Sequence, residues 1–117
     1  KDEHYFLLSI EDVSINLPEL QSSISDFNTK NYKLDGLEIQ NFLLNTSTQL
    51  LRVAGLENKD DALAYYYLIQ ENEQTKKTII KPSIRIFIIS KNNYKTLIKE
   101  KDIKKYMSYF NEIYLLN

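Results

Sequence analysis

The sequence predicts an α+β fold built on one four-stranded antiparallel sheet. Four short segments have the aromatic, branched and apolar composition that is typical of β-strands. Two longer segments between them repeat apolar residues at helical spacing. The resulting order along the chain is β-α-β-β-α-β, followed by one or two additional C-terminal helices.

The first strand and the first helix follow from the start of the chain. Residues 4–10 (HYFLLSI) are aromatic, branched and apolar, as in a strand. Asn16 is a good N-cap, and Pro18 lies in the first turn of the helix that should follow. This helix should end near Asn31. Its apolar residues at helical spacing are Leu17, Leu20, Ile24 and Phe27.

The second and third strands are predicted to form a hairpin. An Asp-Gly turn signal precedes the second strand, which we place at residues 37–44 (LEIQNFLL). The polar segment 45–48 (NTST) is the predicted hairpin loop. The third strand then occupies residues 49–54 (QLLRVA) and ends at Gly55.

The second helix and the fourth strand follow in the same way. Asn58 caps the helix, with two aspartates in the first turn, where the helix dipole favours carboxylates. We expect the helix to run through residues 62–74 (ALAYYYLIQENEQ) and to end before Pro82. The fourth strand is residues 83–89 (SIRIFII).

The C-terminal part of the chain predicts two further helices. Ser90 caps a short one, and Asp102 caps the last one. The last helix carries an apolar stripe that could dock on a partner or could cover this domain's own sheet. The residues of the stripe are Ile103, Tyr106, Met107, Phe110, Ile113 and Tyr114.

The order of these elements is that of the split β-α-β, or ferredoxin-like, arrangement. The right-handed crossover rule then places both main helices on one face of the sheet, with the strands in spatial order 4-1-3-2. The first and fourth strands are apolar at consecutive positions, whereas a strand with one wet face alternates. We therefore expect the second face to be at least partly covered by the C-terminal helix, a partner or a ligand.

Composition excludes most catalytic and many binding classes. The 117 residues fit a single domain, 1–117, with 15 Lys plus Arg against 16 Asp plus Glu, a balance that argues against nucleic-acid binding. No cysteine and one histidine argue against thiolate metal sites and histidine-based triads. Two glycines exclude a glycine-rich phosphate loop. We expect no catalytic residues, no metal and no cofactor, and no apolar run approaches the ~20 residues of a membrane span.

The two arginines of the chain are the first candidates for a binding surface. Arg52 lies in the third predicted strand and Arg85 in the fourth. If the isoleucines of the fourth strand face the helices, Arg85 and Phe87 join Arg52 on the second face, where they could bind a carboxylate, a sugar or an acidic peptide. The alternative is two solvated arginines whose stems cover apolar surface. A C-terminal helix that sealed this face over both arginines would exclude the hypothesis.

Three consecutive tyrosines are the second candidate. Tyr65, Tyr66 and Tyr67 lie on the second helix and span about 200° of its circumference, so at least one of them should be partly exposed. An exposed tyrosine suits a protein interface. The alternative is a ring that packs flat on a neighbouring helix.

Other polar features have structural explanations. We expect His4 at the surface or at a strand end, without a catalytic role. Asp60 and Asp61 point about 100° apart and are explained as helix-start residues. The lysine-rich stretch 91–105 is interrupted by acidic residues and predicts a solvated face.

One resemblance lies in residues 53–62 (VAGLENKDDA). This segment resembles the strand–loop–helix pattern of the SPOR domain, a ferredoxin-like module that binds peptidoglycan glycan strands. Leu56 stands where that pattern has phenylalanine, and no proline follows Gly55. The resemblance implies a glycan-binding module.

A second resemblance covers most of the chain. Residues 4–10, 27–45, 58–66 and 86–115 resemble the C-terminal domain of the tetratricopeptide-repeat lipoproteins linked to gliding motility and type IX secretion in Bacteroidetes. It implies a domain excised from a larger envelope protein, which agrees with a chain that starts at Lys1. It carries over no catalytic residues.

Together these observations predict a non-enzymatic protein-interaction domain of a bacterial cell-envelope protein associated with secretion or gliding motility. It would be periplasmic, with a lipid-anchored parent protein and a homo-oligomer as open options. The alternatives are a SPOR-like peptidoglycan-binding module and a structural cap of an upstream helical-repeat array. The predicted surface comprises Arg52, Arg85 and Phe87, with Tyr65, Tyr66 and Tyr67 as a second interface.

Overall fold

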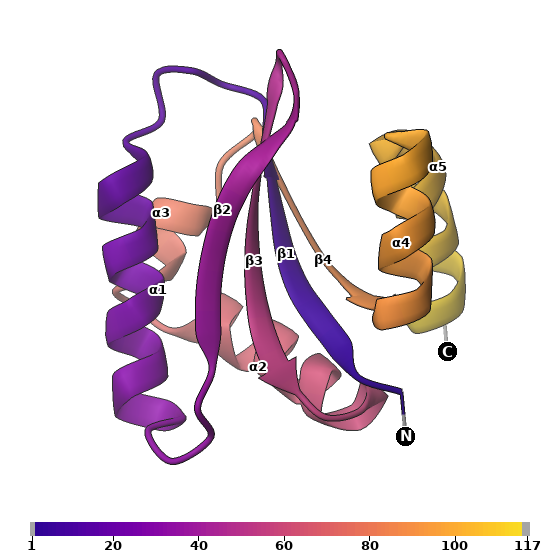
Figure 1. The fold of residues 1–117 in the computed structure, drawn as a ribbon. Coiled ribbons are helices and arrows are strands. Elements are labelled where there is room, and N and C mark those ends of the chain that lie inside the picture. The colour runs from indigo at the N-terminus through magenta and orange to yellow at the C-terminus, as the bar shows by residue number, and fades with distance from the viewer. Residues whose placement is uncertain (1, 116–117) are drawn as a thin grey trace.

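The computed structural model describes residues 2–115, in which four strands and five α-helices interleave (Figure 1). The predicted α+β class and four-stranded antiparallel sheet are confirmed. Lys1, on which the excised-domain prediction partly rests, lies outside the described residues. The elements are β1 (His4–Ile10), α1 (Leu17–Asn31), β2 (Glu38–Asn45), β3 (Thr48–Leu56), α2 (Lys59–Glu71), α3 (Lys76–Ile79), β4 (Ile84–Ser90), α4 (Lys91–Glu100), α5 (Ile103–Phe110) and the π-helix η1 (Asn111–Leu115).

The strands lie in the order β2-β3-β1-β4, so the order read from the other edge is β4-β1-β3-β2. Leu7 of β1 pairs with Arg52 of β3 on one side and with Phe87 of β4 on the other. Directly paired residues point to the same face of a sheet, so these three side chains share the second face. The first face carries three alternating isoleucines of β4, namely Ile84, Ile86 and Ile88.

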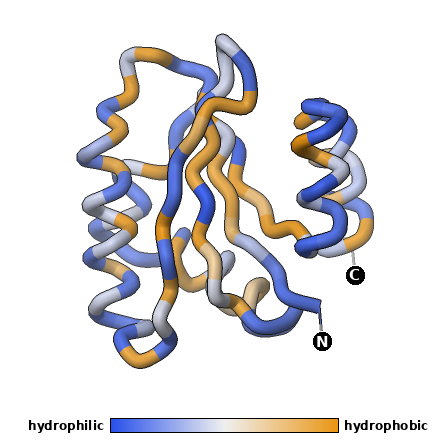
Figure 2. The backbone as a smooth tube through the Cα atoms, viewed as in Figure 1, coloured by the Kyte–Doolittle hydropathy of each residue, from blue (hydrophilic) through white to orange (hydrophobic). Residues whose placement is uncertain are grey.

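The first face of the sheet packs against α1 and α2 (Figure 1). Phe6 of β1 and Phe27 of α1 both contact the ring of Tyr65 on α2, with centroid distances of 5.0 and 5.5 Å. All three rings are buried. Figure 2 shows the hydrophobic residues concentrated in the strands, with hydrophilic residues along the outer surface of α4.

The predicted helix starts are confirmed by their caps. The side chains of Asn16, Asn58, Ser90 and Asp102 each accept a hydrogen bond from a first-turn backbone N–H, at 2.8 to 3.1 Å. Each cap satisfies a donor that has no partner within its helix.

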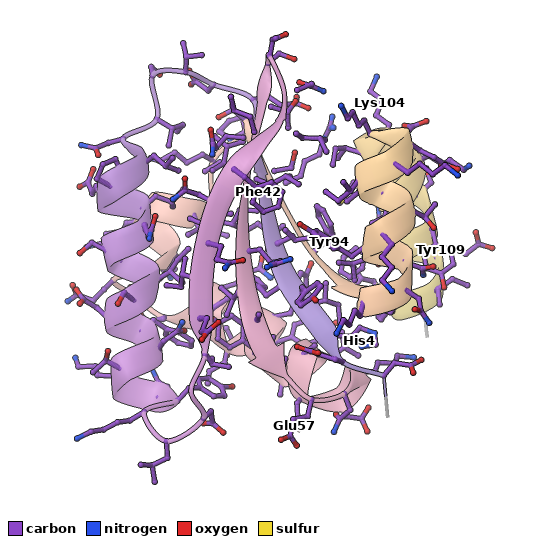
Figure 3. All side chains as sticks on the ribbon, viewed as in Figure 1. His4, Phe42, Glu57, Tyr94, Lys104 and Tyr109 are labelled. Atoms are coloured by element: carbon purple, nitrogen blue, oxygen red, sulfur yellow. The ribbon has the colours of Figure 1, made fainter. Side chains whose placement is uncertain are left out.

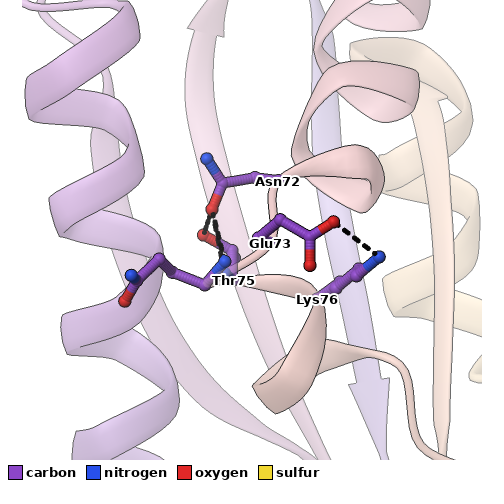
Figure 4. Close-up of polar contacts among 5 residues, drawn as sticks. Asn72, Glu73, Thr75 and Lys76 are labelled. Atoms are coloured by element: carbon purple, nitrogen blue, oxygen red, sulfur yellow. Dashed lines mark hydrogen bonds and ion pairs between the residues drawn. The ribbon is translucent and has the colours of Figure 1, made fainter.

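The second helix ends earlier than predicted and is followed by a short helix that the sequence analysis did not anticipate. α2 stops at Glu71, because Asn72 leaves the helical conformation and its side chain accepts from both the backbone N–H and the hydroxyl of Thr75, each at 2.9 Å (Figure 4). Asparagine side chains compete with helical hydrogen bonds in this way. An ion pair of 3.3 Å between Glu73 and Lys76 then spans the start of α3.

The second face is covered over β1 and β4 by the C-terminal helices. Phe87 is fully buried and contacts the rings of Tyr106 and Phe110, with centroid distances of 5.3 and 6.4 Å. The Tyr106 hydroxyl donates to the carbonyl of Ile88 at 2.6 Å. Tyr106 and Phe110 of the apolar stripe therefore pack on this chain's own sheet, whereas Ile113 of the stripe is 44% exposed.

His4 begins β1, as expected of a strand-end residue, but it is not at the surface, because only 4% of it is exposed. Its Nδ1 lies 2.8 Å from the carbonyl oxygen of Asp2, which can only accept, so Nδ1 carries the proton. Its Nε2 lies 2.8 Å from the hydroxyl of Tyr114, which can then donate to it. The reason for the burial is η1, which places Tyr114 over the start of β1.

Candidate functional site

Arg52 lies in the middle of β3 and faces the second side of the sheet. Leu51 and Val53 on either side of it are fully buried toward α1 and α2, so alternation along the strand turns Arg52 the other way. Its direct neighbour across the β2–β3 hairpin is Gln40. Arg52 is half-buried, and of the C-terminal helices α4 reaches it through the ring of Tyr94.

Three aromatic rings surround the Arg52 guanidinium. The guanidinium carbon lies 4.7 Å from the ring centre of Tyr5, 5.2 Å from that of Tyr94 and 5.9 Å from that of Phe42. Figure 3 shows Phe42 of β2 and Tyr94 of α4 on the same side of the sheet, and their rings meet edge to face at 6.4 Å. These distances are typical of cation–π contacts. We refer to Tyr5, Gln40, Phe42, Arg52 and Tyr94 as the Arg52 cluster.

The polar contacts of the guanidinium are incomplete. One terminal N–H₂ group donates to the side-chain oxygen of Gln40. The Nε is buried and has no hydrogen-bond partner among the described residues, and no carboxylate of residues 2–115 forms an ion pair with Arg52. Burial raises the pKa of the Tyr94 hydroxyl, and the neighbouring Arg52 charge opposes that shift. The cluster therefore presents a fixed cation with unused donors, an arrangement that suits an anion.

The two edges of the sheet differ. β2 forms one edge, and its exposed residues are Glu38, Gln40, Asn41, Leu43 and Asn45. Within residues 2–115, no backbone hydrogen bond outside the sheet ladders involves β2. At the opposite edge, α5 lies against β4, and the Tyr106 hydroxyl donates a hydrogen bond to the carbonyl of Ile88. No described group outside the sheet hydrogen-bonds to the main chain of β2, so this edge offers free main-chain groups to another strand.

Arg85 and Phe87 do not join Arg52 in one site. Arg85 is on the same face but is separated from Arg52 by β1 and by two register positions, and it forms an ion pair of 3.5 Å with Glu11. Phe87 belongs to the core beneath α5, so its expected place on an accessible surface is corrected. The helices seal Phe87 but leave both arginines partly exposed.

The three consecutive tyrosines divide between core and surface. Tyr65 is fully buried, and its hydroxyl donates to the side-chain oxygen of Asn28 at 2.5 Å. Tyr66 is buried and contacts the ring of Phe110 at 5.4 Å. Tyr67 is half exposed, which confirms that the three cannot all be core residues. Of the predicted tyrosine interface, only Tyr67 is accessible.

Sequence reasoning missed four members of the Arg52 cluster. Strand alternation could have indicated Tyr5, because it has the opposite parity to the helix-facing Phe6. The hairpin register could have indicated Gln40, which pairs with Arg52. It could also have indicated Phe42, which lies two residues along β2 and therefore faces the same side. Nothing in the sequence signals Tyr94, because the direction of α4 across the sheet is a tertiary feature.

Comparison with protein-family models, with curated proteins and with solved structures finds no match to this chain. The two family resemblances therefore stay predictions. Within the described residues, no helix is long and apolar enough to cross a membrane, and no group of three acidic, histidine or cysteine residues could hold a metal ion.

Proposed function

We propose that the chain is a non-enzymatic protein-interaction domain that binds an extended segment of a partner protein along β2. The observation that carries this proposal is the difference between the two sheet edges: the Tyr106 hydroxyl of α5 binds a carbonyl of β4, whereas no described group outside the sheet bonds to the main chain of β2. Adding a strand to an exposed edge is a common mode of peptide recognition, in which main-chain hydrogen bonds supply much of the affinity.

The composition of β2 supports this use. Exposed edge strands are usually protected against pairing by lysines, prolines or short length. β2 has eight residues (EIQNFLLN), no proline and no lysine, and Glu38 is its one charged residue. Leu43 is 67% exposed. The strand therefore lacks the usual protection, which fits an edge whose partner is a second protein.

The coverage of the second face favours a protein partner over a glycan. A glycan-binding sheet would present an open face of polar and aromatic groups. Here the C-terminal helices cover much of β1 and β4, and the partly accessible residues of this face include Arg85 and, in the Arg52 cluster, Phe42, Arg52 and Tyr94. A SPOR-like glycan-binding module is the second candidate, favoured by the aromatic rings of that cluster.

Two finer assignments belong to the proposal. The strand order and the alternation of helices and strands support a ferredoxin-like topology with added C-terminal helices. The resemblance to envelope lipoproteins supports a periplasmic location in a secretion or gliding-motility assembly. Both are parts of the proposed function.

The test combines peptide selection with residue-level mapping. Random twelve-residue peptides displayed on phage are selected on the full chain, and enriched peptides are synthesised and titrated while backbone amide signals and hydrogen exchange are followed. We expect new protection at β2 amides, because pairing turns free N–H groups into hydrogen-bonded ones.

The matched control is the same peptide with N-methyl groups at alternate residues. Its side chains are unchanged, but it cannot donate hydrogen bonds along one edge. We expect its binding to weaken by about tenfold or more. The absence of binding peptides, or protection at the Tyr67 surface of α2 instead of β2, would contradict the proposal.

A further inference from the structure

The Arg52 guanidinium retains hydrogen-bonding capacity that the chain itself does not use. It has five N–H donors, and the side-chain oxygen of Gln40 accepts from one terminal nitrogen. The Nε–H is buried without an acceptor among residues 2–115. Buried donors are nearly always satisfied in folded proteins, so an unsatisfied one calls for an explanation.

Its charge is also uncompensated, in contrast to that of the other arginine. Arg85 lies on the same face of the sheet and is paired with Glu11 at 3.5 Å. No described carboxylate pairs with Arg52. The rings of Tyr5 and Tyr94 hold the guanidinium in place and reduce its contact with water, which strengthens its attraction to an anion.

The position of the guanidinium relates this charge to the free edge. Gln40 is directly opposite Arg52 in the hairpin, and the hydrogen bond between their side chains draws the guanidinium over β2. A strand added to β2 would lie about 4.8 Å beyond it. The residue of the added strand that lies opposite Gln40 would point to the same face of the sheet as Gln40 and Arg52. A side chain of ordinary length at that position would reach the guanidinium.

We propose that Arg52 determines the specificity of the β2 edge by binding the carboxylate of an acidic side chain in the partner segment. This inference rests on the proposed function, because it needs a strand paired with β2. A carboxylate is the anion that a guanidinium binds bidentately, and it would supply the negative charge that no described carboxylate provides to Arg52.

A second copy of the chain does not supply this carboxylate. The one acidic residue of β2 is Glu38. When two β2 strands pair symmetrically along their length, centred on Asn41 or on Phe42, Gln40 lies opposite Phe42 or Leu44 of the other copy. In these two registers, which pair most of β2, Glu38 lies away from Arg52, so the proposed carboxylate belongs to a different protein.

The test uses a pair of synthetic peptides. One is a capped twelve-residue peptide of alternating threonine and valine with one central threonine replaced by glutamate, and its twin has glutamine at that position. Both are titrated against the wild-type chain and against Arg52→Gln, Arg52→Lys and Arg85→Gln. Arg85→Gln is the matched control, because it removes the other strand arginine of the same face.

We expect the wild type to bind the glutamate peptide about tenfold more tightly than the glutamine peptide, as hydrogen bonds to charged groups allow. Arg52→Gln should lose this preference and keep its affinity for the glutamine peptide. Arg52→Lys should keep part of it, because it retains the charge but not the planar fork. Arg85→Gln should behave as the wild type does.

The results that would contradict the role of Arg52 differ from those that would contradict the proposed β2 function. Equal binding of both peptides by the wild type would overturn the role of Arg52 while leaving the proposed β2 function intact. Binding of neither peptide would overturn both. If the wild type sediments with amidase-treated peptidoglycan and Arg52→Gln does not, the Arg52 cluster binds a glycan instead. If the chain forms a concentration-dependent dimer that prevents binding of the glutamate peptide, the β2 edge binds a second copy.

Discussion

Tyr65 shows how a single residue can hold two layers of this fold together. Its ring lies between Phe6 of β1 and Phe27 of α1, and its hydroxyl donates to Asn28 of α1. Burial of the side chain raises the pKa of this hydroxyl, with the hydrogen bond to Asn28 opposing the shift. The residue is thus both an apolar core ring and the hydrogen-bond partner of a buried amide.

We predict that Tyr65→Phe lowers the free energy of unfolding by about 1–2 kcal/mol, because it leaves the buried Asn28 oxygen without its donor. Urea denaturation followed by circular dichroism measures the change. The matched control is Tyr67→Phe, which removes a hydroxyl from a half-exposed ring two positions away and should change stability by less than about 0.5 kcal/mol. Equal stability of wild type and Tyr65→Phe would contradict the assigned role of the hydrogen bond.

At the scale of elements, α5 decides the character of the second face. It has the amphipathic pattern of a helix that could dock elsewhere, yet Tyr106 and Phe110 are buried against β4. Tyr109 on its outer side and Ile113 of the following η1 are partly exposed. The helix is therefore a layer of this domain, and its presence limits what a ligand can reach to the β2 side of the sheet.

We predict that Phe110→Ala lowers the free energy of unfolding by about 3–5 kcal/mol, because it leaves a cavity between α5, β4 and α2. Ile113→Ala, at an apolar position of the same C-terminal segment that is 44% exposed, should cost much less. Urea denaturation compares the two variants. Similar losses for both would show that α5 is not packed on the sheet as described.

At the scale of the whole molecule, buried tyrosines link the sheet to both helical layers. Tyr65 joins the first layer, and Tyr106 joins the second through its bond to the Ile88 carbonyl. Tyr114 contacts His4 and so ties the last turn to the first strand, which places the two ends of the described chain side by side (Figure 1). Desolvation raises the pKa of all three tyrosines.

These shifts predict that the protein loses stability in alkali. The unfolded tyrosines ionise at a pKa of about 10 and the folded ones above it, so above about pH 10 the unfolded state releases protons that the folded state retains. This contribution is complete below pH 10 and is lost as the pH rises. Urea denaturation between pH 8 and pH 12 should show the decline, and Tyr65→Phe should show a shallower one. Phenolate absorbance that titrates fully near pH 10 without unfolding would contradict the prediction.

The sequence by itself determined the four strands, four of the five α-helices and much of the sheet. Strand composition, helical spacing and four N-caps are local patterns, because they depend on residues within one or two turns, and the caps formed as predicted. Strand alternation also placed Arg52 on the face of the sheet away from the helices, because its neighbours Leu51 and Val53 face them. The end of α2 was missed because the helical pattern continued while Asn72 formed a competing turn.

Only the tertiary structure decided which face residues are accessible. Phe87 and Arg52 both face the second side, yet α5 buries one and leaves the other in an aromatic cluster completed by Tyr94. His4 is buried by a tyrosine 110 positions away. Such contacts leave no local pattern, because they depend on where a helix crosses the sheet, and that is set by how all the apolar surfaces of the chain pack at once.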